Sequence, residues 1–64
     1  MYAIARISDD REEYIIDQPG QRAFSPALSD ASLYTTRQDV PEPQNDEYIV
    51  RVEVTEDDWL YVGR

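Results

Sequence analysis

The sequence predicts one small α+β domain over residues 1–64, a mainly antiparallel sheet of four to six short strands with one short helix packed on one face. Short stretches rich in β-branched and aromatic residues alternate with polar turn sequences along the chain. A single Ser-Pro pair in the middle of the chain offers a helix start. A chain of 64 residues has room for one domain. Because the sequence has no cysteine, no disulfide can stabilise the core of this domain.

The first part of the chain predicts a hairpin followed by a short third strand. Residues 2–7 and 13–17 have strand composition, and the polar cluster at 8–11 between them has turn chemistry. Pro19-Gly20 ends the second strand, because Pro and Gly suit the two central positions of a type II turn. Residues 22–24 are then expected to form a third strand.

The middle of the chain predicts the helix, a further strand and a loop. Ser25 places a capping hydroxyl before Pro26 at the first helical position, so one or two helical turns are expected over residues 27–31. Residues 33–36 have β-branched and aromatic character, which predicts another strand. The two prolines within 40–46 favour extended backbone and predict a loop.

The strongest pattern lies over residues 47–55, which predict a strand with two different faces. One face is formed by Tyr48, Val50, Val52 and Val54, and the other by Ile49, Arg51 and Glu53. Residues 55–58 then turn the chain, and residues 59–62 return as a closing strand that pairs with the strand over residues 47–55. The last third of the chain is therefore a predicted hairpin.

Acidity dominates the composition, because 14 Asp and Glu oppose six basic residues, all of them Arg, for a net charge of −8. Direct contact with nucleic acid or with anionic membrane lipid is not expected, since phosphate binding needs Lys and Arg. The charge predicts a basic protein partner instead. The beginning of the chain resembles no signal peptide and no stretch is long enough to span a membrane, so we expect a cytoplasmic protein.

The carboxylates fall in three groups, around Asp9, Asp46 and Asp57, where the chain is expected to turn. Turns favour Asp for its hydrogen bonds to the backbone, which explains any single group. Together, however, the groups predict a potential of several kT that complements a cationic site. Trp59 follows the third group as a candidate anchor, and the alternative is that it packs in the core. The predicted partner-binding residues are Asp9, Asp10, Glu12, Glu13, Asp46, Glu47, Glu53, Glu56, Asp57, Asp58 and Trp59.

Catalysis, metal binding and a cofactor are not expected from this sequence. Without His, Cys or Lys, the nucleophiles and bases are limited to hydroxyls and carboxylates, and so small a domain seldom forms a substrate cleft. The acidic runs at 9–13 and 56–58 lack the spacing of a calcium-binding loop. Arg6 and Arg51 lie within predicted strands, where each is expected to pair across the sheet with Asp17 or Glu53.

The small size, the acidic excess, the absence of catalytic residues and the use of Arg without Lys resemble a class of phage-encoded inhibitors that imitate nucleic acid. Anti-CRISPR proteins are its best-known members. The likeness covers the composition of the whole chain and involves no motif. It implies a viral protein, in the cytoplasm of the host cell, that binds a cationic DNA-binding groove. The DNA-recognising large subunit of a type I CRISPR surveillance complex is one example of such a partner, and the inhibitor would exclude target DNA from it.

Two other interpretations remain open. In the first, the protein is a small phage accessory protein or antitoxin-like interaction module that binds its partner through an apolar sheet edge or face. In the second, its acidity serves only solubility or adaptation to a halophilic cytoplasm. Binding by the module should tolerate salt. Acids gathered on one face of the folded chain would favour nucleic-acid mimicry, and evenly spread acids would favour solubility.

Overall fold

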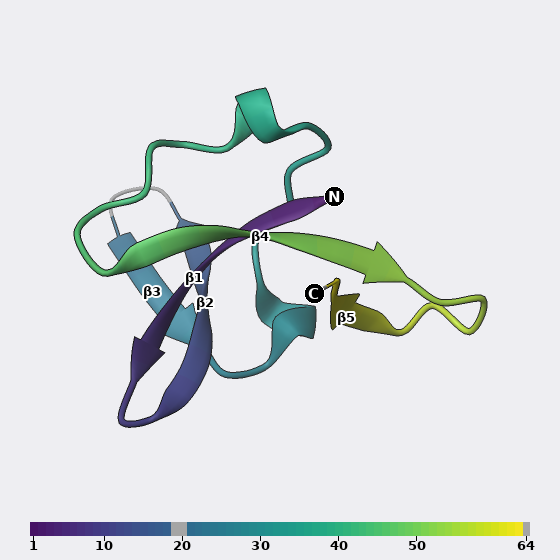
Figure 1. Cartoon of the computed structure of the whole chain (residues 1–64), viewed down its shortest axis with the longest axis horizontal. Coiled ribbons are helices and arrows are strands. Elements are labelled where there is room, and N and C mark those ends of the chain that lie inside the picture. The colour runs from purple at the N-terminus through teal and green to yellow at the C-terminus, as the bar shows by residue number, and fades with distance from the viewer. Residues whose placement is uncertain (19–20, 64) are drawn as a thin grey trace.

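Five strands form one sheet in the computed structural model, which describes residues 1–18 and 21–63. The strands are β1 (Tyr2–Ser8), β2 (Arg11–Gln18), β3 (Gln21–Ser25), β4 (Glu47–Val54) and β5 (Leu60–Val62). Their order in the sheet is β3-β2-β1-β4-β5, and each neighbouring pair is antiparallel. Figure 1 shows β1 and β4 crossing near the middle of the molecule, with β5 beside the far end of β4. The predicted antiparallel sheet of four to six strands is confirmed.

The turn between β1 and β2 is a two-residue loop, because Ser8 pairs directly with Arg11. Asp9 and Asp10 within it both have positive φ, at 51° and 63°. Positive φ at both central positions defines the type I′ turn, whose twist matches that of the flanking strands. Aspartate tolerates this conformation better than most residues. The hairpin predicted here is confirmed, whereas the turn predicted at 19–20 lies outside the described residues.

The helix predicted over residues 27–31 is wrong. The chain forms only a single 3-10 turn, η1 (Leu28–Asp30), so the fold is mainly β and not α+β. The Ser25 hydroxyl accepts a hydrogen bond from the Ala27 N–H at 3.1 Å and donates one to Asp30 at 3.0 Å. Such local serine bonds compete with helix formation. The segment is also too short to offset the cost of nucleating a helix.

The strand predicted over residues 33–36 is also wrong, because only Tyr34 is paired. Its backbone N–H and carbonyl each bond to Tyr2 at 2.8 Å. The register of β1 with β2 covers only Ala5–Ser8, so the start of β1 is open on that side and Tyr34 takes the position. The chain then forms a second 3-10 turn, η2 (Arg37–Asp39), and continues as the predicted loop over 40–46.

The sheet buries side chains on both of its faces. One face carries the main core, and the alternation predicted for β4 is confirmed, with Val50 and Val52 buried there. This core comprises Ala3, Ala5, Tyr14, Val50 and Val52, against which Leu28, Ala31, Leu33, Tyr48, Leu60 and Val62 pack. The opposite face buries Ile4 and Ile15, which are 0% and 2% exposed. A 64-residue chain thus obtains two small layers of apolar contact from one sheet.

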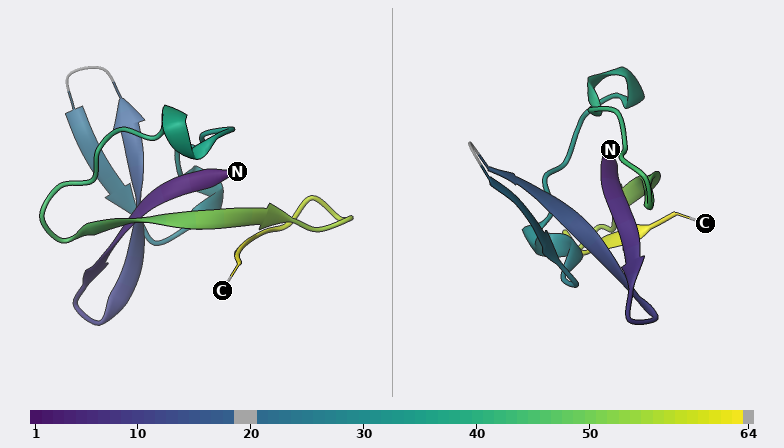
Figure 2. Two further views of the ribbon diagram at one scale, coloured as in Figure 1. Left: turned by 45° about the horizontal axis from the view of Figure 1, so that its top comes forward. Right: turned by 90° about the vertical axis from the view of Figure 1, so that its left-hand side faces the viewer.

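The second face is strongly curved, as shown by contacts between strands that are not neighbours. β3 and β4 stand three positions apart in the sheet, which in a flat sheet is about 14 Å. Yet Arg22 of β3 forms an ion pair with Glu47 of β4, and Arg6 of β1 stacks 3.5 Å from the ring centre of Phe24 in β3. Figure 2 shows β2 and β3 turned out of the plane of β4.

Candidate partner-binding surface

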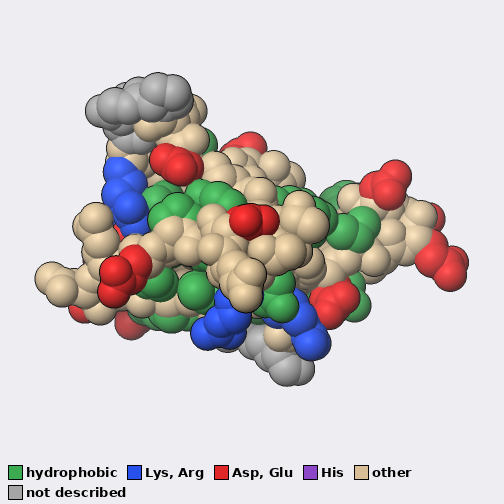
Figure 3. All heavy atoms as spheres, turned by 90° about the horizontal axis from the view of Figure 1, so that it is seen from above, with side chains coloured by type: hydrophobic (Ala, Val, Ile, Leu, Met, Phe, Trp, Pro, Cys, Tyr) green, Lys and Arg blue, Asp and Glu red, His purple; other side chains and the backbone are tan. Residues whose placement is uncertain are grey.

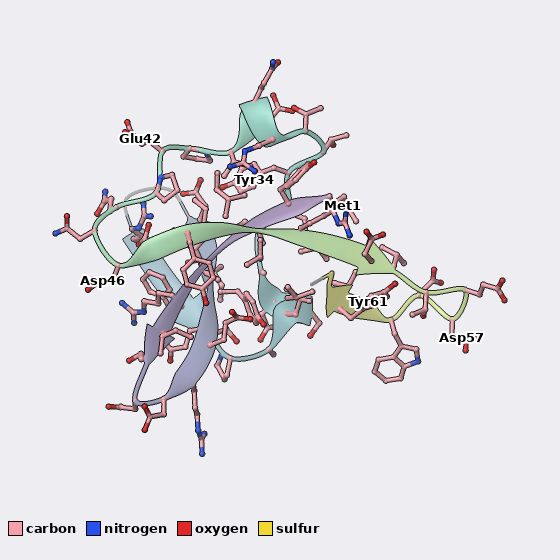
Figure 4. The ribbon with its side chains drawn as sticks, in the orientation of Figure 1. Met1, Tyr34, Glu42, Asp46, Asp57 and Tyr61 are labelled. Carbon is pink, nitrogen blue, oxygen red and sulfur yellow. The ribbon has the colours of Figure 1, made fainter. Side chains whose placement is uncertain are left out.

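The structure places the three acidic turns at two ends of β4. Asp46 lies just before β4 and residues 56–58 follow shortly after its end, and the eight-residue strand between them spans roughly 25 Å. Because Arg6 pairs with Glu47, the β1–β2 turn lies at the same end as Asp46. Figure 4 shows Asp46 and Asp57 on opposite sides of the molecule. Two of the predicted groups therefore lie toward the same end of β4, and the third lies at the other end.

Four of the predicted partner-binding carboxylates make contacts within the fold, namely Glu12, Glu13, Glu47 and Glu53. Glu12 accepts hydrogen bonds from the hydroxyls of Tyr14, at 2.7 Å, and of Tyr48. Glu13 accepts from Arg6 Nε at 3.0 Å. The Glu47 side chain is only 8% exposed and accepts from Arg22 Nε at 3.3 Å, from the Arg22 terminal nitrogen, and from the N–H of Gln44 at 3.0 Å. Their partners explain these positions without any second molecule.

The arginines expected to pair within the sheet do so. Arg51 contacts Glu53 at 2.9 Å, which is one of the predicted partners, but the two residues lie along the same strand β4 and not across the sheet. Arg6 pairs with Glu13 and not with Asp17, because the register of β1 and β2 sets Arg6 directly opposite Glu13.

Asp17 instead accepts a long hydrogen bond from the Tyr34 hydroxyl at 3.4 Å. Burial raises the pKa of Tyr34, and the charge of Asp17 and this hydrogen bond raise it further, against an opposing effect of Arg22.

The loop of the β4–β5 hairpin is held by three local hydrogen bonds. The N–H of Thr55 donates to the Trp59 carbonyl at 2.9 Å, and the N–H of Asp58 donates to the Thr55 carbonyl at 3.0 Å. The Thr55 hydroxyl accepts from the Trp59 N–H at 3.1 Å. Asp58 has a φ of 64°. A three-residue loop whose last residue is left-handed is a common hairpin connection, so residues 56–58 form a defined tip.

Trp59 lies on the outside of this hairpin, where it is 72% exposed. The alternative that it packs in the core is wrong, and strand alternation explains why. Leu60 and Val62 turn toward the core, which leaves Trp59 and Tyr61 on the opposite face. Tyr61 is 50% exposed and lies opposite Glu53 on β4. We call the set Glu53, Trp59 and Tyr61 the hairpin face; Tyr61 was not among the predicted residues, although the alternation over 59–62 contained the signal.

The hairpin tip is also acidic, with three consecutive carboxylates at residues 56–58. The sequence has no basic residue from Val52 to Gly63. In the view of Figure 3, carboxylates cover the protruding end of the molecule, and arginine side chains lie toward the middle and the opposite end. The ion pairs found among the described residues involve Arg6, Arg22 and Arg51, none of which lies on the tip.

The other end of β4 has a different character. A groove of about 330 Å³ is lined there by Arg6, Ile7, Ser8 and residues 44–47. Arg6 and Glu47 are both in ion pairs, so their charges are compensated within the fold. Asp46, which also lines the groove, is exposed. Within residues 1–18 and 21–63, no three His, Cys, Asp or Glu side chains gather as metal ligands would.

Comparison of the chain with models of protein families, with curated proteins and with solved structures finds no match. Across the described part of the chain, no helix has the length and apolar character needed to cross a membrane. The function is therefore inferred from the geometry and charge of the surface itself.

Proposed function

We propose that the protein binds a basic surface of another protein through the β4–β5 hairpin and catalyses no reaction. The observation that carries this proposal is an exposed Trp59 beside three carboxylates, in a segment without any basic residue. Uncompensated carboxylates attract a cationic partner over distances near the Debye length and speed its association. An aromatic side chain then supplies short-range binding energy that charge alone does not.

We further propose that the partner's basic surface is one that binds nucleic acid, so that the protein acts as an inhibitor. Dividing the longest extent of the molecule, 33 Å, by its eight net charges gives roughly one charge per 4 Å. A single nucleic-acid strand carries about one charge per 3.4 Å, and a duplex carries about twice that density. The charge density therefore favours imitation of one strand over imitation of a duplex. An anti-CRISPR activity against the DNA-recognising large subunit of a type I complex belongs to this class.

Competition against DNA tests the proposal. A purified type I surveillance complex is bound to labelled target DNA, and the protein is added while fluorescence anisotropy follows release of the DNA. Displacement is expected at ~50 mM salt and should weaken steeply by ~200 mM. If the protein neither binds the complex nor lowers its affinity for DNA at low salt, inhibition of this target by mimicry is refuted.

Two variants with the same change of charge locate the contact. The tip variant, E56Q/D57N/D58N, removes three charges from the hairpin, and the turn variant, D9N/D10N/D46N, removes three from the other end of β4. Asparagine tolerates positive φ, so neither variant strains its turn. The tip variant is expected to lose at least tenfold more affinity than the turn variant. Equal losses would show that the net charge matters and the hairpin does not.

A second candidate is an interaction module that binds without imitating nucleic acid. The observation that favours it is the exposure of apolar side chains on the same hairpin, with Trp59 and Tyr61 72% and 50% exposed on one face and Val54 46% exposed on the other. Under this alternative, binding tolerates salt, the tip variant binds almost normally, and Trp59→Ala removes most of the affinity. The salt titration and the two variants therefore separate the candidates in one set of measurements.

A further inference from the structure

We infer that the hairpin face selects arginine over lysine in its partner, by stacking guanidinium groups on Trp59 and Tyr61 beside the carboxylates of Glu53 and the tip. This inference rests on the proposed function and specifies the chemistry of the partner. The occupant of the hairpin face is an arginine-rich segment of another protein. The rings of Trp59 and Tyr61 make the contact, and the acidic tip adds charge complementarity.

The spacing of the two rings suits an extended cationic segment. Trp59 and Tyr61 are two residues apart on one face, which sets their attachment points about 7 Å apart. Alternate side chains of an extended partner have the same spacing. Glu53 lies opposite Tyr61, and its side chain is 41% exposed. Glu53 already pairs with Arg51 at 2.9 Å, so the uncompensated carboxylates near the rings are those of the tip, beside Trp59.

Charge decides against a second copy of this chain as the occupant. Two copies would each bring a net charge of −8, and their hairpin tips would repel one another. A cationic segment instead gains attraction from the carboxylates and contact with the rings. The surface therefore fits a basic partner better than self-association.

Guanidinium fits this surface better than ammonium. It is planar and weakly hydrated, stacks on aromatic rings and binds carboxylates through two parallel hydrogen bonds, whereas the lysine ammonium is a compact, strongly hydrated charge. The fold already contains such an arrangement, because Arg6 lies 3.5 Å from the ring centre of Phe24 and donates to Glu13 at 3.0 Å. At an exposed ring, a cation–π contact is expected to change affinity by about two- to fivefold.

Oligoarginine and oligolysine peptides of equal length and charge test the inference. Trp59 is the only tryptophan, so its fluorescence reports binding at the hairpin face directly. The arginine peptide is expected to bind about five- to tenfold more tightly at low salt, through two rings. Labelled peptides measured by anisotropy extend the comparison to variants without Trp59. Trp59→Ala should lower this preference to that of a single ring, Trp59→Phe should lower it less, and the turn variant should leave it unchanged.

The outcomes separate the inference from the function on which it rests. Equal affinity for the two peptides, or a preference that Trp59→Ala leaves undiminished, overturns the inference and leaves binding to a basic surface intact. Failure of the wild-type protein to bind either peptide at low salt overturns the proposed function as well. Because Trp59 is 72% exposed, Trp59→Ala should fold normally, and circular dichroism with a urea midpoint verifies this.

Discussion

Replacement of Glu47 by Gln is expected to destabilise the protein more than the same replacement of Glu53, although both residues lie on β4. The Glu47 side chain is 8% exposed and links β4 to β3 through Arg22. The carboxylate also accepts the N–H of Gln44 at 3.0 Å, which fixes the chain entering β4. Glu53 and Arg51 form their pair in open solvent, with side chains 41% and 60% exposed.

The size of the effect follows from these exposures. Hydrogen bonds to charged groups contribute about 1.5–3 kcal/mol. Arg22 is 34% exposed and regains water when its partner is neutral, so the expected loss lies at or just below the lower end of this range, at about 1–2 kcal/mol. The exposed pair of Arg51 and Glu53 is worth about 0–1 kcal/mol. A 64-residue domain has roughly 3–10 kcal/mol of stability in total, so the loss at Glu47 is a considerable fraction.

Urea unfolding followed by far-ultraviolet circular dichroism measures the difference. With a slope near 1 kcal/mol per molar urea, Glu47→Gln should lower the midpoint by about 1–2 M, and Glu53→Gln by less than about 1 M. Equal midpoints would refute the argument that the curved face depends on the pair of Arg22 and Glu47. Partner binding gives an independent outcome: if Glu47→Gln stays folded but loses affinity, Glu47 belongs to the binding surface as the sequence predicted.

Three further predictions follow from the turns, the tip and the second face. Asp9→Asn combined with Asp10→Gly should raise the free energy of unfolding by about 0.5–1 kcal/mol, because Asn-Gly is a preferred type I′ pair; an unchanged urea midpoint contradicts the turn type. Caesium should quench Trp59 fluorescence more than iodide does, with the difference shrinking near 1 M salt; equal quenching contradicts an acidic surrounding. Because the pKa of Tyr34 is raised from 10.0, the stability it contributes is complete below pH 10 and is lost as pH rises through the folded-state pKa. Tyr34→Phe, and more weakly Asp17→Asn, should therefore reduce the alkaline fall in unfolding free energy, and an unchanged profile in both contradicts this.

The strands were predictable from sequence where alternation was long or a turn was well marked. β4 shows the longest alternation, and β1, β2 and β3 occur close to their predicted ranges. The segment between β3 and β4 was not predictable, because its residues have strand and helix propensities but form only 3-10 turns and a single bridge in the fold. Tyr34 can pair only with the open start of β1, which depends on where β2 diverges from β1.

The candidate surface was predictable in composition but not in arrangement. The contacts that Glu12 and Glu47 make within the fold depend on Tyr48 and Arg22, which are distant in the sequence and are brought near by the pairing of β1 with β4 and by the curvature of the sheet. The same register places the Asp9 turn at the end of the sheet occupied by Asp46. The exposure of Trp59, in contrast, follows from local alternation alone and is available from sequence once Leu60 is assigned to the core. Partner, inhibitory activity and viral origin stay predictions.

The central position of β1 has a consequence for how the chain folds. On one side β1 meets β2 across a two-residue turn, and on the other it meets β4, with most of the chain lying between Ser8 and Glu47. Closing the longer loop costs roughly 2–3 kcal/mol more in chain entropy. The β1–β2–β3 meander should therefore form early, and β4 should dock late with the hairpin already attached. Substitutions at Asp9 and Asp10 will then change the refolding rate, whereas those on β4 will act mainly on the rate of unfolding.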